Sequence, residues 1–289
     1  MGITARLPWW MKLAGKLILA RAPLPYHLWR KAGMFRHGEM NNPLRAINTF
    51  QAYFNRARRY VSLGDGFQSL ELGPGDSVLS GIVARAYGAE QAWLVDVGNF
   101  AETDLAACSR TVAYLSADGK SAPKISGAST LAEVLDLSRV RYLTAGVASL
   151  KEIPTASIDF IWSQVVLEHI HLEEFQSVLA QLRRVAKPTA VGIHAVDFRD
   201  HLGGRLNNLR FSRDVWESWA FQNSGFYTNR IRPRQMIRLF EKAGFLVEVI
   251  RETRWDNIPI RRHQLASAFA RLPDEELAVA EFEIATKFA

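Results

Sequence analysis

The stretch from Ser69 to Asp96 constrains the fold more than any other part of the chain. It begins as a short apolar strand and passes through a turn that contains Gly73 and Gly75. Apolar residues then recur at helical spacing: Leu79, Ile82, Val83 and Ala86. A second apolar strand ends at Asp96, roughly 20 residues after the glycines. This order is typical of the first half of a nucleotide-binding sheet, because glycine lets the backbone approach a ligand closely and a distant carboxylate can meet a ribose diol.

The same turn excludes two common phosphate-binding sites. A dinucleotide fingerprint requires a third glycine in the order G-x-G-x-x-G, whereas Gly75 is followed by Asp76, Ser77 and Val78. The chain also lacks the G-x-x-x-x-G-K-[ST] pattern of a P-loop. The alternative for this segment is an ordinary strand-to-helix turn in which glycine serves backbone geometry alone.

A second block lies between residues 157 and 196. Residues 157–163 read as a buried strand after a turn, and Leu167, Glu168 and His169 follow it. A helix is expected next, from apolar residues at helical spacing: Phe175, Val178, Leu179, Leu182 and Val185. We expect Pro188 to stop this helix, since proline cannot continue it, and a further strand to run over residues 190–196.

Together the two blocks resemble class I S-adenosylmethionine-dependent methyltransferases, in particular the type 11-like bacterial enzymes of uncharted substrate. The first block resembles their cofactor site in the pattern Glu71-x-Gly73-x-Gly75 with Asp96. The second resembles their run of acidic-Phe strand, Leu-Glu-His, helix, Arg-Val-x-Lys-Pro and strand. The matching residues are Asp159, Phe160, Leu167, Glu168, His169, Arg184, Val185, Lys187 and Pro188. The resemblance covers about residues 65 to 200.

The resemblance and the alternation of strands and helices imply an α/β fold with a doubly wound, mainly parallel, seven-stranded sheet of the Rossmann-like methyltransferase type. Further strands are expected at residues 140–144, at 245–251 after a helix over 234–243, and near the end of the chain. We expect a helical cap at residues 1–60 and a methyltransferase domain at residues 61–289. An insert on the substrate side, residues 197–232, would follow the fifth strand.

The expected cofactor is S-adenosyl-L-methionine. By resemblance, Gly73 and Gly75 would approach its methionine end, Asp96 would bind the ribose, and Glu71 would organise the loop or the amino group. Ser163 and Gln164 complete the expected cofactor-binding set.

One position departs from the family pattern. Related enzymes often carry an acidic residue just after the third strand, where this chain has Val147. We therefore expect backbone groups or Ser149 to hold the adenine. Ser77 takes the place of a further glycine, where a hydroxyl can cap the helix.

The candidate catalytic residues follow from the rule that ligands of open α/β sheets bind beyond the carboxyl ends of the strands. His201 is the preferred base, because histidine accepts a proton near neutral pH, and His169 and Asp197 are the other candidates. The alternative for His169 is that it orders its loop. His194, Asp197 and His201 match no metal-binding motif, so no metal is expected.

The expected activity is methyl transfer to an oxygen or nitrogen of a small molecule or glycan. A net charge of +7 makes an anionic acceptor plausible. An RNA methyltransferase is the second reading, but the arginines are dispersed rather than gathered in a basic module. A degenerate, non-catalytic interaction protein is the third, favoured by Val147 and opposed by the glycines and Asp96.

The N-terminal stretch, residues 7–20, is interrupted by Lys12 and Lys16, so neither a membrane span nor a cleaved signal peptide is expected. With Trp9, Trp10 and Trp29 it could lie on a membrane surface, and a helical cap over the cofactor pocket is the preferred alternative. The single cysteine, Cys108, excludes an internal disulfide. We expect a cytoplasmic protein, either fully dissolved or peripheral at the inner membrane surface.

Overall fold

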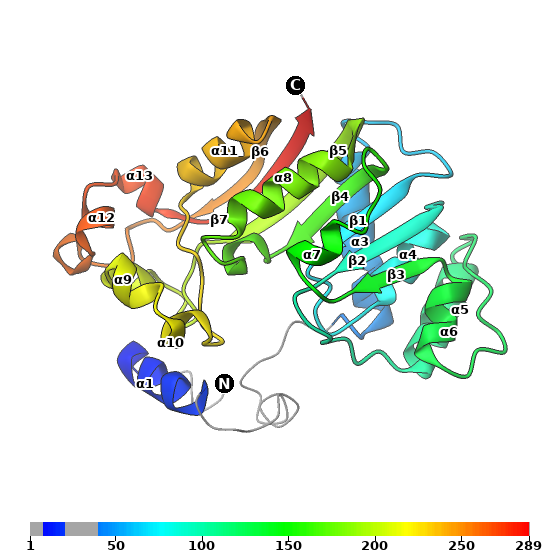
Figure 1. The fold of residues 1–289 in the computed structure, drawn as a ribbon, viewed down its shortest axis with the longest axis horizontal. Coiled ribbons are helices and arrows are strands. Elements are labelled where there is room, and N and C mark those ends of the chain that lie inside the picture. The colour runs from blue at the N-terminus through cyan, green and yellow to red at the C-terminus, as the bar shows by residue number, and fades with distance from the viewer. Residues whose placement is uncertain (1–7, 21–39, 289) are drawn as a thin grey trace.

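The computed structural model describes residues 8–20 and 40–288. Its centre is a seven-stranded sheet with the order β3-β2-β1-β4-β5-β7-β6 (Figure 1). The strands are β1 (Gln68–Leu72), β2 (Gln91–Val95), β3 (Val140–Leu143), β4 (Ile158–Gln164), β5 (Ala186–Asp197), β6 (Phe245–Arg254) and β7 (Val279–Phe288). Only β7 runs antiparallel to its neighbours β5 and β6. The predicted doubly wound, mainly parallel α/β sheet of the Rossmann-like type is confirmed.

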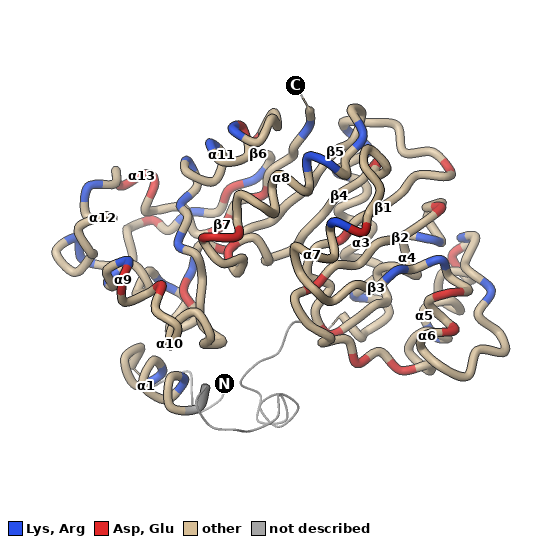
Figure 2. The backbone as a smooth tube through the Cα atoms, in the orientation of Figure 1, with Lys and Arg blue, Asp and Glu red and all other residues tan. Residues whose placement is uncertain are grey.

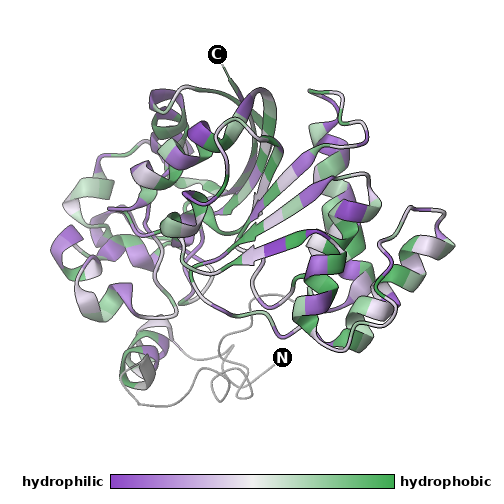
Figure 3. Ribbon diagram, turned by 45° about the vertical axis from the view of Figure 1, so that its right-hand side comes forward, coloured by the Kyte–Doolittle hydropathy of each residue, from purple (hydrophilic) through white to green (hydrophobic). Residues whose placement is uncertain are grey.

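Helices cover both faces of the sheet (Figure 1). The helices of the described residues, on and beside the sheet, are α1 (Trp9–Ala20), α3 (Pro43–Ala57), α4 (Leu79–Ala86), α5 (Leu105–Ala117), α6 (Leu131–Leu137), α7 (Val147–Leu150), α8 (Phe175–Val185), α9 (Arg213–Trp216), α10 (Trp219–Gln222), α11 (Pro233–Lys242), α12 (Ser267–Ala270) and α13 (Asp274–Leu277). Short 3₁₀ turns are η2 (Leu167–His169), η3 (Asn207–Arg210) and η4 (Arg262–Gln264). In Figure 3 the helices around the sheet carry both hydrophobic and hydrophilic segments, as helices packed on one side do.

One face of the sheet packs against α3, α4 and α5 in a single apolar cluster. Phe50 of α3 lies at its centre, with ring centroids 6.2 Å from Phe160 and 6.0 Å from Trp162. Asn42 caps the start of α3 by accepting from the backbone N–H groups of Leu44 and Arg45. The division between residues 1–60 and 61–289 stays a prediction, but α3 shares its core with the sheet.

The other face packs against α7, α8 and α11. Here α8 ends at Val185, and β5 begins at once with Ala186, earlier than the predicted strand start at residue 190. Pro188 therefore lies inside the strand rather than in a connecting turn. It lies where the pairing with β4 shifts register, between Ala186 and Val191, and such an irregularity tolerates the missing N–H of proline.

Residues 197–232 carry η3, α9 and α10 and pack around the buried ring of Trp216. Trp9, Leu13 and Leu17 of α1 contact this same cluster (Figure 1). Helix α1 thus covers the segment after β5. Trp29, which the sequence places with Trp9 and Trp10, lies outside the described residues. Among residues 8–20 and 40–288, no helix combines the length and the apolar character that a membrane span requires. The cytoplasmic location and the surface contact with a membrane both stay predictions.

Candidate cofactor and acceptor site

The loops after β1, β2 and β3 are joined at the carboxyl edge of the sheet. The backbone N–H of Gly73 donates to the carbonyl of Val95 at 2.8 Å, and the N–H of Asp96 donates to Leu143 at 2.9 Å. The N–H of Gly146 donates to the carbonyl of Asp96 at 2.8 Å. These bonds bring the predicted glycine turn and the predicted acidic residue together with the loop that contains Val147.

The glycine turn requires glycine for two reasons. Gly73 and Gly75 both have a φ of +67°, in the left-handed region that other residues avoid. A Cβ on Gly73 would lie 2.4 Å from Cγ2 of Val166. The bare backbone at Gly73 is therefore in direct contact with the segment that follows β4. Main chain that carries no side chain of its own lets neighbouring groups approach closely at this edge, as a cofactor site requires.

The carboxylate of Asp96 lies beside this turn. The backbone N–H of Gly75 donates to its Oδ2 at 3.0 Å, and the N–H of Val97 donates to its Oδ1 at 2.7 Å. The side chain is mostly buried, with 9% of the residue exposed. These bonds fix the carboxylate at the end of β2, in the place where the resemblance puts the ribose-binding acid.

Glu71 faces helix α4 from the last part of β1. Its carboxyl accepts a hydrogen bond from the hydroxyl of Ser80, and the residue is buried. Burial, and to a lesser extent the nearby charge of Asp96, together raise the pKa of Glu71 to about 8. Glu71 is therefore protonated near neutral pH, and its contacts within the described chain fasten the loop to α4.

This buried acid gives a testable pH dependence of stability. The folded chain keeps the Glu71 proton up to a pKa of about 8, whereas the ordinary pKa of a glutamate exposed to water is 4.5. Between these values the folded state binds more protons, so the free energy of unfolding falls as pH rises, by about 1.4 kcal/mol per pH unit for the group. Urea unfolding between about pH 5.5 and about pH 7.5 measures this slope.

We expect Glu71→Gln to make that slope shallower by the contribution of one proton, because glutamine can still accept from Ser80 but does not titrate. Glu173→Gln, which removes an exposed carboxyl, is the matched control and should leave the slope unchanged. Equal slopes for Glu71→Gln and the unaltered chain would show that Glu71 is ionised in the folded protein.

Ser163 and Gln164, the other predicted cofactor residues, end β4 on opposite faces of the sheet. Ser163 is fully buried, and its hydroxyl lies 2.8 Å from Nδ1 of His194. Burial lowers the pKa of His194 to about 3, so this imidazole is neutral in the core. The structure does not bring the Ser163 side chain to the exposed edge. Gln164 is exposed there and lines a cavity of about 210 Å³ with Tyr53. Cofactor contacts by both residues stay predictions.

Apolar side chains border the carboxylate of Asp96 on the side of the third strand. Val97 is 73% exposed, and a Cβ built on Gly146 would lie 3.4 Å from its Cγ1. Val147 begins α7 next to Gly146. Ser149 is turned inward, where its hydroxyl accepts from the N–H of Ala145 at 2.8 Å. The residues at this place are thus apolar, and Ser149, expected near the adenine, is used inside its own loop.

The turn after β4 departs from ordinary backbone geometry at Val165. This residue has a φ of +57°, which is rare and strained for a β-branched side chain. The unusual turn directs the side chain of Val166 onto Gly73. The turn η2 begins at the next residue, so His169 follows this contact closely along the chain. The sequence did not indicate this turn or this contact, because Val165 and Val166 have the side chains of ordinary strand residues.

The two predicted catalytic histidines lie against each other. The Nε2 atoms of His169 and His201 are 3.2 Å apart, and the rings are stacked with centroids 4.9 Å apart. Nδ1 of His169 lies 3.0 Å from the carbonyl oxygen of Tyr227. Since a carbonyl can only accept, Nδ1 of His169 carries the proton, and Nε2 of His201 then donates to Nε2 of His169. In this arrangement Nδ1 of His201 is the unprotonated nitrogen.

Asp197 at the end of β5 takes part in a separate charged cluster. The guanidinium of Arg199 lies 2.9 Å from Oδ1 of Asp197 and also contacts Glu281. The backbone N–H of Asp197 donates to Glu168 of η2 at 3.1 Å. Burial raises the pKa of Glu168 to about 8, so this neighbour is protonated near neutral pH. The catalytic role predicted for Asp197 stays a prediction.

The aromatic residues of the insert serve mainly as packing. Trp216 is buried and donates from its indole N–H to the carbonyl of Thr228 at 2.7 Å. Asn229, which the sequence analysis did not select, donates from its side chain to the carbonyls of Leu167 at 2.8 Å and Ile170 at 3.0 Å. It thereby ties the insert to η2, the turn that contains His169.

Comparison with known proteins identifies the domain. Residues 70–193 match a family model described as a methyltransferase domain. That range covers most of both blocks of the sequence and the joined loops around Gly73 and Asp96. This part of the chain is therefore similar to a methyltransferase domain, which agrees with the mainly parallel sheet and the joined loops described above. A search of curated proteins found no match to the chain.

Several solved structures are similar at low sequence identity. Phosphoethanolamine N-methyltransferase 2 of Haemonchus contortus, solved with S-adenosyl-L-methionine, is 15% identical, with 83% of this chain and 52% of that chain covered and a TM-score of 0.46. The CurJ carbon methyltransferase is 12% identical over 84% and 54%, with a TM-score of 0.45. A SAM-dependent methyltransferase of Archaeoglobus fulgidus is 13% identical over 83% and 94%, with a TM-score of 0.44. The chain spans about half the length of the first two.

Proposed function

We propose that the protein transfers a methyl group from S-adenosylmethionine to an oxygen or nitrogen of a small molecule or glycan. The observation that carries the proposal lies at the carboxyl edge of the sheet, where the glycine turn at Gly73 and Gly75 is hydrogen-bonded to the fixed carboxylate of Asp96. When bound there, S-adenosylmethionine supplies a methyl carbon on a positively charged sulfur. Transfer then depends on alignment of the acceptor atom with that carbon, which is the task of the surrounding residues.

The residues of this edge suit the parts of the cofactor. The carboxylate of Asp96 suits the ribose diol, and the turn at Gly73 and Gly75 suits the methionine end. Val97 and Val147 offer apolar surface for the adenine ring in place of the acidic residue expected after the third strand. Backbone groups near Gly146 would then meet the amino edge of the adenine.

The histidine pair suits removal of a proton from the acceptor. Nδ1 of His201 is the nitrogen that would accept the proton, while His169 fixes the ring through the bond between the two Nε2 atoms. His169 is in turn held by the carbonyl of Tyr227. We therefore assign His201 as the base and His169 as a positioning residue. Asp197, paired with Arg199, is a candidate for binding the acceptor.

The first experiment is a calorimetric titration with S-adenosylmethionine, followed by incubation of the protein and cofactor with fractionated small molecules and glycans. A product heavier by one methyl group, detected by mass spectrometry, identifies the acceptor. Failure of the unaltered chain to bind the cofactor would overturn the proposal and favour a non-catalytic interaction protein.

With the acceptor identified, we expect His201→Gln to lower kcat by about 100-fold or more, the usual contribution of a general base. His169→Gln should lower kcat less and leave the acid limb of the pH profile in place, because the base itself remains. Gln176→Asn, a change at an exposed position on α8, serves as the control and should leave kcat unchanged. Equal and small effects of both histidine changes would rule out the proton-transfer role.

A nucleic-acid acceptor is the second candidate, and the charge distribution does not favour it. Lysine and arginine are interspersed with aspartate and glutamate along the described chain (Figure 2). Recognition of RNA usually employs a continuous basic surface.

A further inference from the structure

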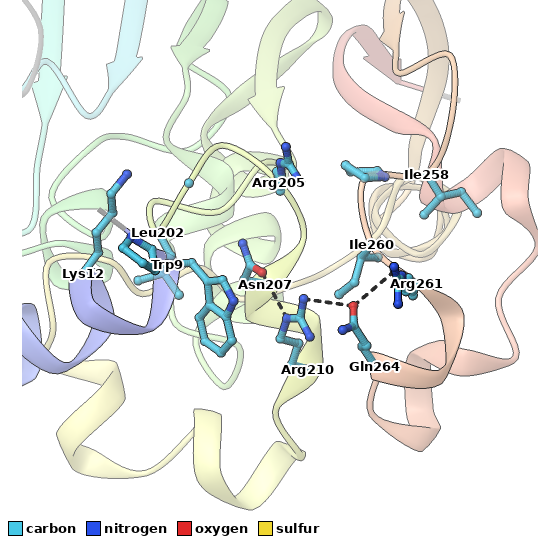
Figure 4. Close-up of a pocket in the computed structure, with 13 residues that line it drawn as sticks. Trp9, Lys12, Leu202, Arg205, Asn207, Arg210, Ile258, Ile260, Arg261 and Gln264 are labelled. Carbon is cyan, nitrogen blue, oxygen red and sulfur yellow. Dashed lines mark hydrogen bonds between the residues drawn. The ribbon is translucent and has the colours of Figure 1, made fainter. Parts of the chain in front are cut away.

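A cavity of about 640 Å³ lies between three segments that are far apart in the sequence (Figure 4). Helix α1 contributes Trp9 and Lys12, the loop after β5 contributes residues 202–210, and the loop after β6 contributes residues 258–264. Leu202 and Gly203 in its lining directly follow His201, the proposed base. A volume of this size accommodates a small organic ligand.

The lining of this cavity is strongly basic. It includes Lys12, Arg205, Arg210 and Arg261, and it includes no aspartate or glutamate. Across residues 8–20 and 40–288, none of these four side chains forms an ion pair with a carboxylate. Like charges repel when they are gathered around one cavity, so an anion that enters it gains attraction from several sides.

Arg210 is held in a fixed position inside this lining. Its Nε donates to Oδ1 of Asn207 at 3.0 Å, and its Nη2 donates to Oε1 of Gln264 at 3.1 Å (Figure 4). The guanidinium also lies 4.9 Å from the ring centroid of Trp9. Both hydrogen-bond partners are neutral, and the nearby carboxylate of Asp200 accepts from Asn207 rather than from Arg210. A guanidinium ordered in this way is prepared to bind an oxyanion with little loss of conformational entropy.

Part of the lining is apolar. Leu202, Ile258 and Ile260 contribute to it next to the cations, and Ile260 is largely buried. The cavity thus offers a basic side and an apolar side. A ligand that carries an oxyanion on an organic body matches both, whereas a bare inorganic ion matches only the first.

We propose that this cavity binds the phosphate group of an organic phosphate ester, and that this group belongs to the methyl acceptor. Three arginines and a lysine provide more positive charge than a ligand with a single carboxylate would need. The planar guanidinium groups also suit the oxygens of a phosphate. The assignment as acceptor rests on the proposed methyltransferase function and on the position of the lining next to His201. The phosphate itself binds here whether or not methyl transfer occurs.

The test is a calorimetric titration with phenyl phosphate, with phenol as the neutral comparison. We expect phenyl phosphate to bind and phenol not to bind. The double variant Arg205→Gln/Arg261→Gln, which changes two exposed side chains, should weaken phenyl phosphate binding by about tenfold or more. The double variant Arg110→Gln/Arg141→Gln removes the same charge from exposed positions on α5 and β3 and should change binding by less than about twofold.

A second arm separates a soluble phosphate ester from a lipid headgroup. Sedimentation with phosphatidic acid vesicles, compared with phosphatidylcholine vesicles, tests the lipid. Loss of vesicle binding in Arg205→Gln/Arg261→Gln but not in Arg110→Gln/Arg141→Gln would place a lipid headgroup in the cavity. If neither phenyl phosphate nor phosphatidic acid binds, or if both double variants bind equally, the proposal is wrong.

Failure of this proposal can be told apart from failure of the proposed function. Titration with S-adenosylmethionine should give the same affinity in the unaltered chain and in Arg205→Gln/Arg261→Gln, because the cavity lining contains neither Gly73 nor Asp96. Cofactor binding without phosphate binding would refute the cavity alone. Phosphate binding without cofactor binding would refute the methyltransferase function and leave the cavity as an anion site.

Discussion

Gly73→Ala should abolish measurable binding of S-adenosylmethionine and lower the free energy of unfolding by about 2–5 kcal/mol. About 1–2 kcal/mol comes from placing a side chain in the left-handed region, and overpacking commonly costs about 1–3 kcal/mol more. The overpacking arises because the new Cβ would lie 2.4 Å from Cγ2 of Val166. Calorimetry with the cofactor and urea unfolding measure the two effects.

The chain offers a matched control for this change. Gly119 has a φ of +72°, and a Cβ there meets no atom within 4 Å. Gly119→Ala should therefore show the backbone cost alone and retain cofactor binding. The double variant Gly73→Ala/Val166→Ala should recover part of the lost stability, since it removes the colliding methyl groups. No recovery would mean that Val166 does not lie on Gly73.

Asp96→Ala should weaken binding of S-adenosylmethionine by about 100-fold or more. Two hydrogen bonds from a ribose diol to a charged acceptor are worth about 1.5–3 kcal/mol each, and about 1.4 kcal/mol corresponds to tenfold in affinity. The change also leaves the N–H of Gly75, which donates to Oδ2 at 3.0 Å, without this acceptor. A loss of stability of about 1–3 kcal/mol is therefore expected as well.

Two further variants separate these effects. Asp96→Asn keeps one acceptor oxygen for the two N–H groups of Gly75 and Val97 and loses the charge, so it should recover only part of the stability lost in Asp96→Ala while cofactor affinity still falls. Asp159→Asn is the control, because this carboxylate pairs with Lys187 at the other end of β4 and should not influence the cofactor. Undiminished affinity of Asp96→Ala would contradict the proposed function.

The glycine turn and its acidic partner could be predicted from the sequence, because spacing along a strand–turn–helix–strand unit determines which residues reach one edge of a parallel sheet. A mainly parallel, seven-stranded sheet was expected from the alternation of strands and helices and from the family resemblance, and α11 ends near Gly244 as its pattern indicates. These predictions depend on the spacing of residues that lie near each other in the sequence, so local patterns were enough to make them.

Contacts between distant segments could not be predicted in this way. The contact of Val166 with Gly73 and the stacking of His169 on His201 join parts of the chain that share no pattern. Ser163 illustrates a different failure. A strand that is buried on both faces does not alternate between apolar and polar residues, so the sequence did not indicate that this hydroxyl points toward His194 in the core.

The direction of β7 has a practical consequence for attaching anything to this protein. Because β7 runs against its neighbours, it starts beside the carboxyl end of β5 and finishes with Phe288 paired to Phe245, at the beginning of β6 (Figure 1). The polypeptide therefore leaves the sheet on the side away from the loops that carry Gly73 and Asp96. An affinity tag, a fluorophore or a surface tether attached after β7 would therefore lie away from the candidate cofactor site and leave it accessible.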